Sequence, residues 1–428
     1  MTQQDMISID QAFEFYEQYS VSSIYTCPLS EAHRHYLAQD VISQIALPLF
    51  DQSAVDGYAL SSQDILDGIR QFELLGEIRA GVRNSVAVTT GQCLRIFTGG
   101  LLAAGTDSVA RQEIVSLAHG KIQLHQTIEK GCDVRYQGEE LGVGTVLARR
   151  GQWLNSGLIA ALSMAGVTQL SVYRRPRIAV LITGDEVATT YDPAQYSRVG
   201  DPPKTSIDRE DHHVYDANAP MILTWLQAQG YAGIYLEHVA DNHEAVQRAL
   251  SNALNHYDVV ISTGGVSVGD YDLIRPVSKT LGAEEIFWKV AQKPGKPMYF
   301  ARYQHAGRHC YLLGLPGNPA AVWVALWVHV ATLLNALQGC PSARPRWQMA
   351  KLKTGNILKM DSREQLLRMR LDVDAHGQGI VSTLHKQQSH MLSNLATANV
   401  IARIPIFNDP QQAPDYIACI PTVAEPLL

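Results

Sequence analysis

The feature that most constrains the fold is an alternation of apolar strands and helices between residues 176 and 338. Residues 178–182 read Ile-Ala-Val-Leu-Ile, a continuous apolar run that is typical of a strand buried on both faces. The same segment predicts three more strands, at 234–236, 259–262 and 311–315, and helices at 218–229, at 243–254 and from 320 onward. Asn218 is predicted to cap the first of these helices. Strands that alternate with helices indicate a parallel, doubly wound α/β sheet.

The segments that flank this α/β region have other patterns. Helical apolar spacing occurs at three places: 8–19, 30–43 and 156–165. Residues 47–140 contain short alternating runs separated by glycine and aspartate turns, which predicts a mainly β insert. Residues 341–428 lack helical periodicity and predict a small all-β domain, and the polar stretch at 195–213 predicts a long surface loop.

Bulk composition excludes several classes of protein. The formal net charge of -6 does not fit a protein whose main ligand is nucleic acid, because such proteins concentrate basic residues. The six cysteines are scattered without a CxxC pair, which argues against a zinc site and favours a reduced, cytosolic setting. His329 and Asn335 interrupt the most apolar run, so it is interpreted as a buried helix and no membrane span is predicted. The histidines show no metal-binding spacing and are interpreted as surface or satisfied core residues.

Three loops that follow predicted strands carry polar and flexible residues. They are Thr183-Gly-Asp-Glu186, residues 262–272 and Leu315-Pro-Gly-Asn-Pro319. In an open α/β sheet, ligands bind in the crevice at the carboxyl ends of the strands. We therefore expect the three loops to meet at one edge of the sheet and to form a binding site there.

Each loop also has a purely structural interpretation. Gly264, Gly265 and Ser267 suit a close approach to phosphate, although an ordinary strand-to-helix turn has the same composition. The acids at 185, 186, 270 and 272 predict magnesium beside that phosphate, or only helix caps. The turn Lys293-Pro-Gly-Lys-Pro297 suits an oxyanion, or is a solvated loop. Asp56 lies in an Asp-Gly turn, which by itself is usually structural.

Eight segments, in register along the chain, resemble a known family. They are Phe50-Asp-Gln-Ser-Ala-Val-Asp-Gly-Tyr-Ala59, Arg95-Ile-Phe-Thr-Gly-Gly100, Arg135 with Gly138-Glu-Glu140, Thr183-Gly-Asp-Glu186, Val214-Tyr-Asp-Ala-Asn218, the glycine loop that ends Gly269-Asp-Tyr-Asp272, Lys293-Pro-Gly-Lys-Pro297 and Leu315-Pro-Gly-Asn-Pro319; Gln388-Ser-His390 is a weaker match. The family is MoeA, the molybdopterin molybdenumtransferases, which includes the gephyrin E domain.

The resemblance implies an α/β multidomain fold with four domains. They are an elongated helical linker domain (1–45 and 141–173), the mainly β insert (46–140), a MogA-like doubly wound α/β domain (174–340) and a C-terminal β-barrel (341–428). It also implies a homodimer, in which the active site lies between the α/β domain of one subunit and the insert of the other.

The implied reaction inserts molybdate into adenylylated molybdopterin, with magnesium, and yields molybdenum cofactor and AMP. The implied partners are the MogA-like molybdopterin adenylyltransferase that supplies the substrate, and molybdoenzymes or chaperones that receive the product. The expected setting is cytoplasmic, and neither nucleic acid nor a membrane is expected as a partner. Implied catalytic residues are Asp56, Thr98, Arg135, Asp185, Glu186 and Asp272, and magnesium ligands are Asp56, Asp185, Glu186 and Asp272. Implied substrate-binding residues are Gly264, Gly265, Ser267, Lys293, Lys296, Pro316, Pro319, Arg368 and Ser389.

The chain departs from the family's pattern in a few places. Glu140 stands where the family often has aspartate, Gln388 replaces a glycine, and the segment before Arg368 lacks the usual acidic and aromatic pair. Three alternatives to an insertase stay open: a diverged paralogue that binds the pterin without turnover, a scaffold protein, and a nucleotide pyrophosphohydrolase on a related α/β domain. The sequence does not distinguish molybdate from tungstate, because the two oxyanions have nearly the same size.

Overall fold

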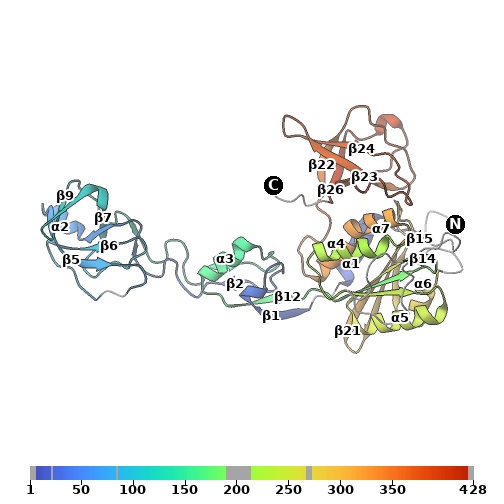
Figure 1. Ribbon diagram of the computed structural model, residues 1–428, viewed down its shortest axis with the longest axis horizontal. Coiled ribbons are helices and arrows are strands. Elements are labelled where there is room, and N and C mark those ends of the chain that lie inside the picture. Colours follow the sequence, from blue (N-terminus) through green and yellow to red (C-terminus); the bar gives the residue numbers. More distant parts are fainter. Residues whose placement is uncertain (1–5, 21–22, 83–84, 189–213, 267–271, 423–428) are drawn as a thin grey trace. The chain divides into compact units, whose positions relative to one another are not determined.

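A computed structural model describes residues 6–20, 23–82, 85–188, 214–266 and 272–422 (Figure 1). The predicted loop at 195–213, Ser267 and the predicted acid Asp270 lie outside the described residues. The chain divides into two compact units: the first contains residues 1–25, 34–36 and 172–428, and the second contains residues 26–33 and 37–171.

The first unit is built around a six-stranded sheet in the order β16-β13-β17-β21-β20-β18. In that order the strands are Tyr235–Val239, Ile178–Thr183, Val259–Thr263, Arg308–Leu315, Tyr299–His305 and Glu284–Trp288. The first four are parallel, which confirms the doubly wound prediction, whereas β20 and β18 run antiparallel to their neighbours. A short parallel pair, β14 (Val187–Ala188) and β15 (Val214–Tyr215), lies outside this sheet.

Helices cover both faces of the sheet (Figure 1). On one face lie α1 (Ile9–Tyr19), α4 (Asn218–Ala228), α7 (Pro319–Ala325) and α8 (Ala331–Leu337), and on the other α5 (His243–His256) and α6 (Ile274–Thr280). Along β13 the side chains alternate between the two faces: Val180 and Ile182 join the first core, and Ala179 and Leu181 the second. A strand buried on both faces therefore has no polar side, which explains its continuous apolar run.

Two helices on the first face are buried, although the place of one in the chain and the composition of the other suggest different locations. α1 belongs to the segment predicted as linker, yet Ile9, Phe13 and Tyr16 are fully buried in the core of the α/β unit. Among the described residues, Pro319–Leu337 is the one helical stretch with the length and composition to cross a membrane, but 72% of it is buried. It is the core helix that the sequence predicts, and its middle, Leu326–Val330, is π-helical.

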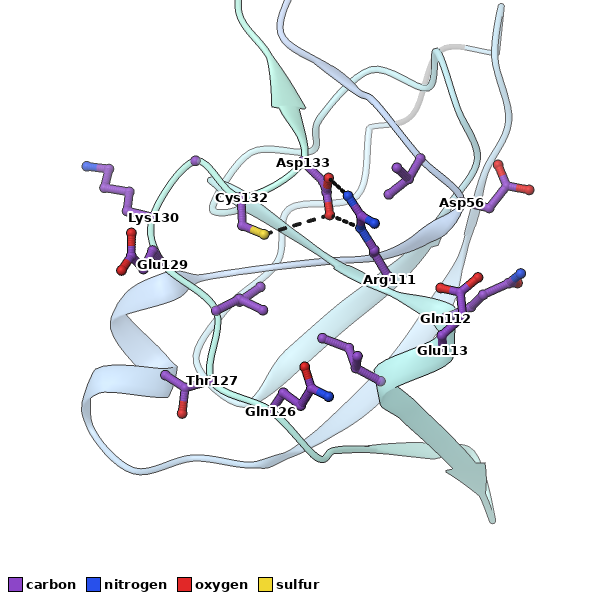
Figure 2. A pocket seen from close by; sticks show the side chains of 14 residues that line it. Asp56, Arg111, Gln112, Glu113, Gln126, Thr127, Glu129, Lys130, Cys132 and Asp133 are labelled. Atoms are coloured by element: carbon purple, nitrogen blue, oxygen red, sulfur yellow. Dashed lines mark hydrogen bonds and ion pairs between the residues drawn. The ribbon is translucent and has the colours of Figure 1, made fainter.

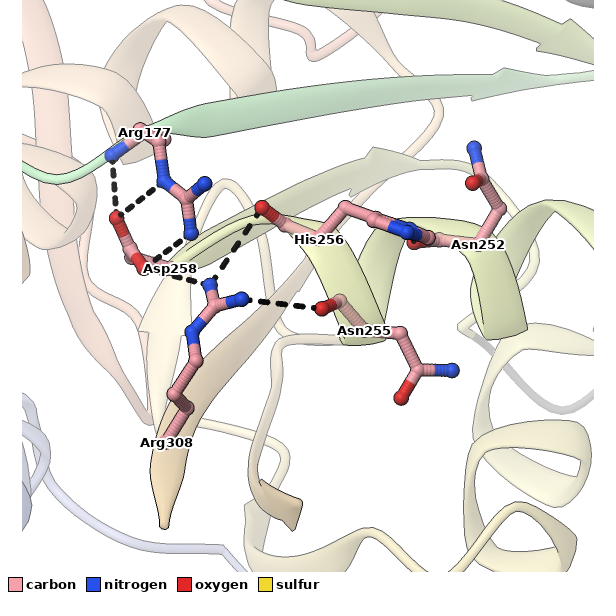
Figure 3. A network of polar contacts seen from close by, with 6 residues as sticks. All are labelled: Arg177, Asn252, Asn255, His256, Asp258 and Arg308. Carbon is pink, nitrogen blue, oxygen red and sulfur yellow. Dashed lines mark hydrogen bonds and ion pairs between the residues drawn. The ribbon is translucent and has the colours of Figure 1, made fainter. Parts of the chain in front are cut away.

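A polar network joins the amino-terminal ends of three sheet strands (Figure 3). Asp258, just before β17, accepts hydrogen bonds from the backbone N–H of Arg177 at 2.8 Å and from the Arg308 guanidinium at 3.1 Å. Arg308 also donates to the carbonyl of Asn255 near the end of α5, at 3.2 Å. These arginines are engaged in bracing the sheet at the edge opposite to the loops that were predicted to bind substrate.

The C-terminal part of the first unit is a closed five-stranded barrel in the order β23-β24-β22-β26-β25, with β25 pairing back to β23. The strands are Glu364–Val373, Gly379–Thr383, Gln348–Leu352, Tyr416–Pro421 and Val400–Ile404. β19 (Gln292–Lys293) pairs in parallel with β23, so the turn that follows Gln292 is tied to the barrel by backbone hydrogen bonding. The predicted C-terminal β-barrel is confirmed.

The second unit contains the predicted β insert, a six-stranded sheet in the order β7-β4-β6-β5-β9-β8. Its strands are Ser108–Arg111, Gly57–Leu60, Gln92–Ile96, Gln71–Ile78, Lys121–Leu124 and Val115–Ala118, with helix α2 at Ser62–Leu66. Beside it, β3 (Gln52–Ser53) pairs with β10 (Val134–Arg135), and β2 (Val41–Ile42) pairs with β11 (Val146–Ala148). Helix α3 (Ser156–Met164) confirms the helix predicted there; β1 (Ile24–Pro28) and β12 (Gln169–Tyr173) form another pair.

The helix predicted at 30–43 is wrong. Only a 3-10 turn at Leu29–Glu31 and the short β2 occur in this region. Arg34 has a φ of 63°, a left-handed conformation that cannot continue a right-handed helix. The N–H groups of Leu37 and Ala38 bind the carbonyls of Gln152 and Ser171, so long-range pairing replaces the local hydrogen bonds of a helix.

Candidate functional site

The order of the parallel strands predicts a ligand site between the ends of β13 and β17. The chain leaves β13 for β16 on one side and reaches β21 beyond β17 on the other, and such a reversal opens a ligand crevice at the carboxyl ends. Thr183, the last residue of β13, donates its hydroxyl to the carbonyl of Thr263, the last residue of β17, at 3.1 Å. The loops after these strands therefore begin side by side, as predicted.

The glycines of the second loop are required by close packing. Gly264 has a φ of +80°, and a methyl group on it would lie 2.6 Å from the Thr183 hydroxyl oxygen. Gly265 has a φ of +65°, and a methyl group there would lie 2.9 Å from a side-chain carbon of Ile274. Larger residues would both strain the backbone and push the strand ends apart. This steric need is shared by a phosphate loop and an ordinary turn, so the phosphate assignment stays a prediction.

A carboxylate that the sequence analysis missed joins the predicted acids. Asp241 follows β16, and its backbone N–H donates to the Asp185 carboxylate at 3.1 Å. Burial raises the pKa of Asp241, and the negative charges of Asp185 and Glu186 raise it further. The sequence feature that could have identified Asp241 is its position, two residues after a strand that ends at the same edge of the sheet. Accumulated negative charge of this kind is relieved by a cation.

Metal binding at these acids is not preformed in the described part of the chain. No group of three or more His, Cys, Asp or Glu side chains there is placed to hold a metal ion. Asp272 is half-buried two residues before α6 begins, and Asp56 lies in the other unit. Magnesium commonly uses one or two carboxylates plus substrate phosphates and water, so the donor type fits although a closed protein cage is lacking.

Buried polar atoms at the same edge also lack partners. Among the described residues, Asp216 Oδ2, Asn218 Oδ1, Ser262 Oγ and Thr263 Oγ1 have no hydrogen bond. Asp216, and not Asn218 as predicted, caps α4, because its Oδ1 accepts from the N–H groups of residues 218 and 219. Its Oδ2 lies 3.5 Å from His238 Nε2, and burial raises the pKa of this carboxyl. Buried polar atoms without hydrogen bonds, such as Ser262 Oγ and Thr263 Oγ1 at the end of β17, suit a polar ligand.

Three segments lie close together: the lysine turn (residues 293–297), the proline loop (residues 315–319) and the loop that carries Ser389. A methyl group on Gly295 would lie 3.6 Å from Pro316, so the lysine turn packs directly on the proline loop. Asn318 donates its side-chain amide to Ser389 Oγ at 3.2 Å, just before Pro319 begins α7. Lys293 pairs with Asp361 at 2.7 Å, whereas Lys296 is exposed and has no ion-pair partner in the described part of the chain.

Arg368 is placed differently from a free anion-binding group. It is 1% exposed, and its guanidinium donates to the carbonyls of Lys386, Gln388 and Met391 at 2.9–3.1 Å. All of these acceptors belong to the loop that carries Ser389. Arg368 therefore fixes that loop, and any effect on an oxyanion is exerted through it.

In the second unit, Asp56 and Thr98 form a hydrogen-bonded pair. Asp56 Oδ1 accepts from the backbone N–H and from the hydroxyl of Thr98, each at 2.9 Å. These two bonds lower the pKa of Asp56, which keeps the exposed carboxylate ionised. The side chain lines a cavity of about 920 Å³ together with the bidentate pair Arg111–Asp133 (Figure 2). Arg135 is exposed and lines a separate cavity of about 480 Å³ with Glu140.

Three family profiles match successive parts of the chain. Residues 7–166 match the MoeA N-terminal region (domain I and II), residues 179–336 a probable molybdopterin binding domain, and residues 351–406 the MoeA C-terminal region (domain IV). The molybdopterin molybdenumtransferase of Nostoc sp. is 31% identical over 385 residues, covering 88% of this chain and 83% of the relative. The chain belongs to the molybdopterin molybdenumtransferase family.

Other proteins named as members of this family are similar in sequence or share the fold. The Haemophilus influenzae enzyme of that name is 30% identical and covers 87% of each chain. Two crystal structures of the Pyrococcus horikoshii MoeA protein share the fold, with TM-scores of 0.78 and 0.75, identities of 23% and 21%, and coverage of at least 97% of this chain. The predicted family, multidomain fold and transferase class are thus confirmed, and the chain is an enzyme of molybdenum cofactor biosynthesis. The domain boundaries and the roles of single residues stay predictions.

Proposed function

We propose that this transferase inserts molybdate into adenylylated molybdopterin and releases AMP in a magnesium-dependent reaction. The observation that carries the proposal is the composition of one sheet edge. Asp185 and Asp241 gather negative charge at the ends of β13 and β16, while the lysine turn packs on the proline loop after β21. A diphosphate with its cation and a second anion can therefore be bound by one edge. Tungstate is an alternative oxyanion for the same lysines.

The chain's own residues have separate tasks in this scheme. Asp185, Glu186 and Asp272 would hold magnesium against the diphosphate, where the ion supplies charge neutralisation. Lys296 and Lys293 would bind the oxyanion, and the polar atoms near Asp216 and Thr263 would orient the pterin-bearing substrate. Catalysis would come from positioning and electrostatics, without a covalent protein nucleophile.

Molybdate dependence of AMP release tests the function. Purified enzyme should release AMP from adenylylated molybdopterin when both molybdate and magnesium are present, and chelation with EDTA should stop the release. Equal release without molybdate would identify a pyrophosphohydrolase instead. Binding of the substrate without any release would identify the non-catalytic paralogue or scaffold.

We propose a homodimer, as the family resemblance implies, in which Asp56 of one subunit serves the sheet-edge acids of the other. The second unit exposes an apolar patch, defined here as Leu49, Phe50 and Met164, which are 53%, 36% and 57% exposed and line one cavity with Arg135. Exposed apolar clusters mark association sites in soluble proteins. A second copy that covers this patch could present its insert to the acids of the first.

Phe50→Glu should convert the dimer into a monomer, because a buried charge at the interface is strongly unfavourable. Size-exclusion chromatography with light scattering measures the mass. Leu66→Glu is the matched control, since Leu66 is 77% exposed in the insert but lies outside the patch. A Phe50→Glu protein that stays dimeric would show that this patch is not the interface. The remaining partners, an adenylyltransferase that delivers the substrate and cytoplasmic molybdoenzymes or chaperones that accept the product, follow from the proposed reaction.

A further inference from the structure

A buried chain of hydrogen bonds runs from α1 to the lysine turn. Tyr16 and His329 are fully buried, and Tyr16 Oη lies 3.1 Å from His329 Nδ1. His329 Nε2 lies 2.7 Å from Oε1 of Gln292, which is also fully buried. Gln292 Nε2 donates to the carbonyl of Gly295 at 3.2 Å. Gly295 is the middle residue of the turn that carries Lys293 and Lys296.

The Gly295 carbonyl at the end of this chain determines which atom donates in each hydrogen bond. The Gly295 carbonyl only accepts, so the Gln292 amide must present its NH₂ there and its oxygen to His329. That oxygen requires an N–H on Nε2, which leaves Nδ1 as an acceptor for the Tyr16 hydroxyl in a neutral imidazole. Burial lowers the pKa of His329 to about 3, so the ring is neutral at any physiological pH. The chain therefore has one consistent arrangement of protons.

The backbone around His329 is unusual. It lies within Leu326–Val330, the π-helical segment between α7 and α8. Short π-helical insertions in α-helices often occur at functional sites, because they turn a side chain out of the regular helical register. Here the irregular turn contains His329, the histidine that contacts Gln292. Gln292 is otherwise held through its backbone, by pairing with Glu364 in β23 and by a hydrogen bond from Arg363 to its carbonyl at 2.9 Å.

We propose that His329, with Tyr16 behind it, is a positioning residue that sets the lysine turn for oxyanion binding through the side chain of Gln292. This inference rests on the proposed function, because it takes the lysine turn to be the oxyanion site. Without the imidazole, Gln292 Oε1 would be a buried acceptor with no donor, and the amide would no longer be held against Gly295. The N–H of Val290 would still hold the Lys296 carbonyl at 3.0 Å, but the middle of the turn would lose its side-chain support, and the exposed Lys296 side chain would be less well placed.

The test compares four variants by two measurements. His329→Phe keeps the ring size and removes both nitrogens, Tyr16→Phe removes the first donor, and His329→Gln keeps an N–H at the distance of Nε2. Leu333→Ala is the matched control, because Leu333 is fully buried in the same core and its loss lowers stability without touching the turn. The measurements are the Kd for molybdate by calorimetry and hydrogen–deuterium exchange of residues 290–298, with thermal unfolding recorded for all variants.

His329→Phe is expected to weaken molybdate binding on the order of tenfold and to speed exchange in residues 290–298, as Tyr16→Phe should to a smaller extent. His329→Gln should restore both. Leu333→Ala should lower the Tm while leaving both unchanged. If His329→Phe leaves exchange and affinity at wild-type values, His329 does not position the turn. If the wild-type enzyme itself fails to bind molybdate, the proposed function is wrong, and the exchange measurement still decides whether His329 holds the turn.

Discussion

Asp56→Ala is expected to lower molybdate-dependent AMP release about 100- to 1000-fold while the protein stays folded. Asp56 is exposed, so its loss removes no core packing. Two hydrogen bonds from Thr98 lower the pKa of its carboxyl group, and these bonds also fix the direction of the side chain. A preorganised charge that costs the fold little is typical of a catalytic group. Steady-state AMP release and circular dichroism of the variant measure the two expectations.

The control is Asp67→Ala, which removes an exposed carboxylate from the same insert. It should leave AMP release unchanged. Wild-type rates for Asp56→Ala would remove Asp56 from the active site and leave its Asp-Gly turn with a structural role only.

A mixing experiment shows whether Asp56 acts in the neighbouring subunit. Asp56→Ala and Asp185→Ala are each expected to be inactive as homodimers. If the site combines the insert of one subunit with the α/β domain of the other, a mixed dimer contains one site with both acids intact and recovers activity. If both acids serve a site within one subunit, every site of the mixed dimer lacks one acid, and activity stays absent.

Arg368→Met is expected to lower the free energy of unfolding by about 2–4 kcal/mol. Burial lowers the pKa of Arg368 to about 10, which is still above neutral pH, so the guanidinium stays charged and its hydrogen bonds are strong. Removing it relieves the cost of burying a charge but takes one charged donor from each of the carbonyls of Lys386, Gln388 and Met391. The Lys386 carbonyl still accepts from the Asn394 amide, and the Gln388 carbonyl from the N–H of Met391. We expect the lost hydrogen bonds to outweigh the relief, and denaturant unfolding measures the difference.

Oxyanion affinity should fall in the same variant, because the Ser389 loop loses its support. Arg368→Lys should not restore stability, since one ammonium group cannot reach acceptors spread along this loop. Arg370→Met is the control on the same strand, where the arginine is exposed and pairs with the exposed Asp372 at 3.0 Å. If Arg368→Met loses affinity with full stability and unchanged exchange in residues 386–391, Arg368 contacts the oxyanion directly.

Much of the architecture was predictable because it is encoded locally. The apolar run at Ile178–Thr183 reports burial on both faces, and the strand-helix alternation that follows it defines a parallel sheet. The helix at residues 30–43 was predicted wrongly for the same reason, because its apolar spacing is helical. Arg34 has a left-handed backbone, and the N–H groups of Leu37 and Ala38 bind distant carbonyls in place of helical ones. Local periodicity does not report which far segment will pair.

By itself, the sequence determined where the main strands, helices and β domains follow one another along the chain. It also identified the polar loops at the strand ends. Those features follow from side-chain spacing within a few residues. The tertiary structure alone decided that Asp241 joins Asp185, that Arg368 is buried against backbone carbonyls, and that Tyr16 meets His329 from 313 positions away. Burial and hydrogen-bond partners depend on which distant segments come together, and that choice is made by the packing of the whole unit.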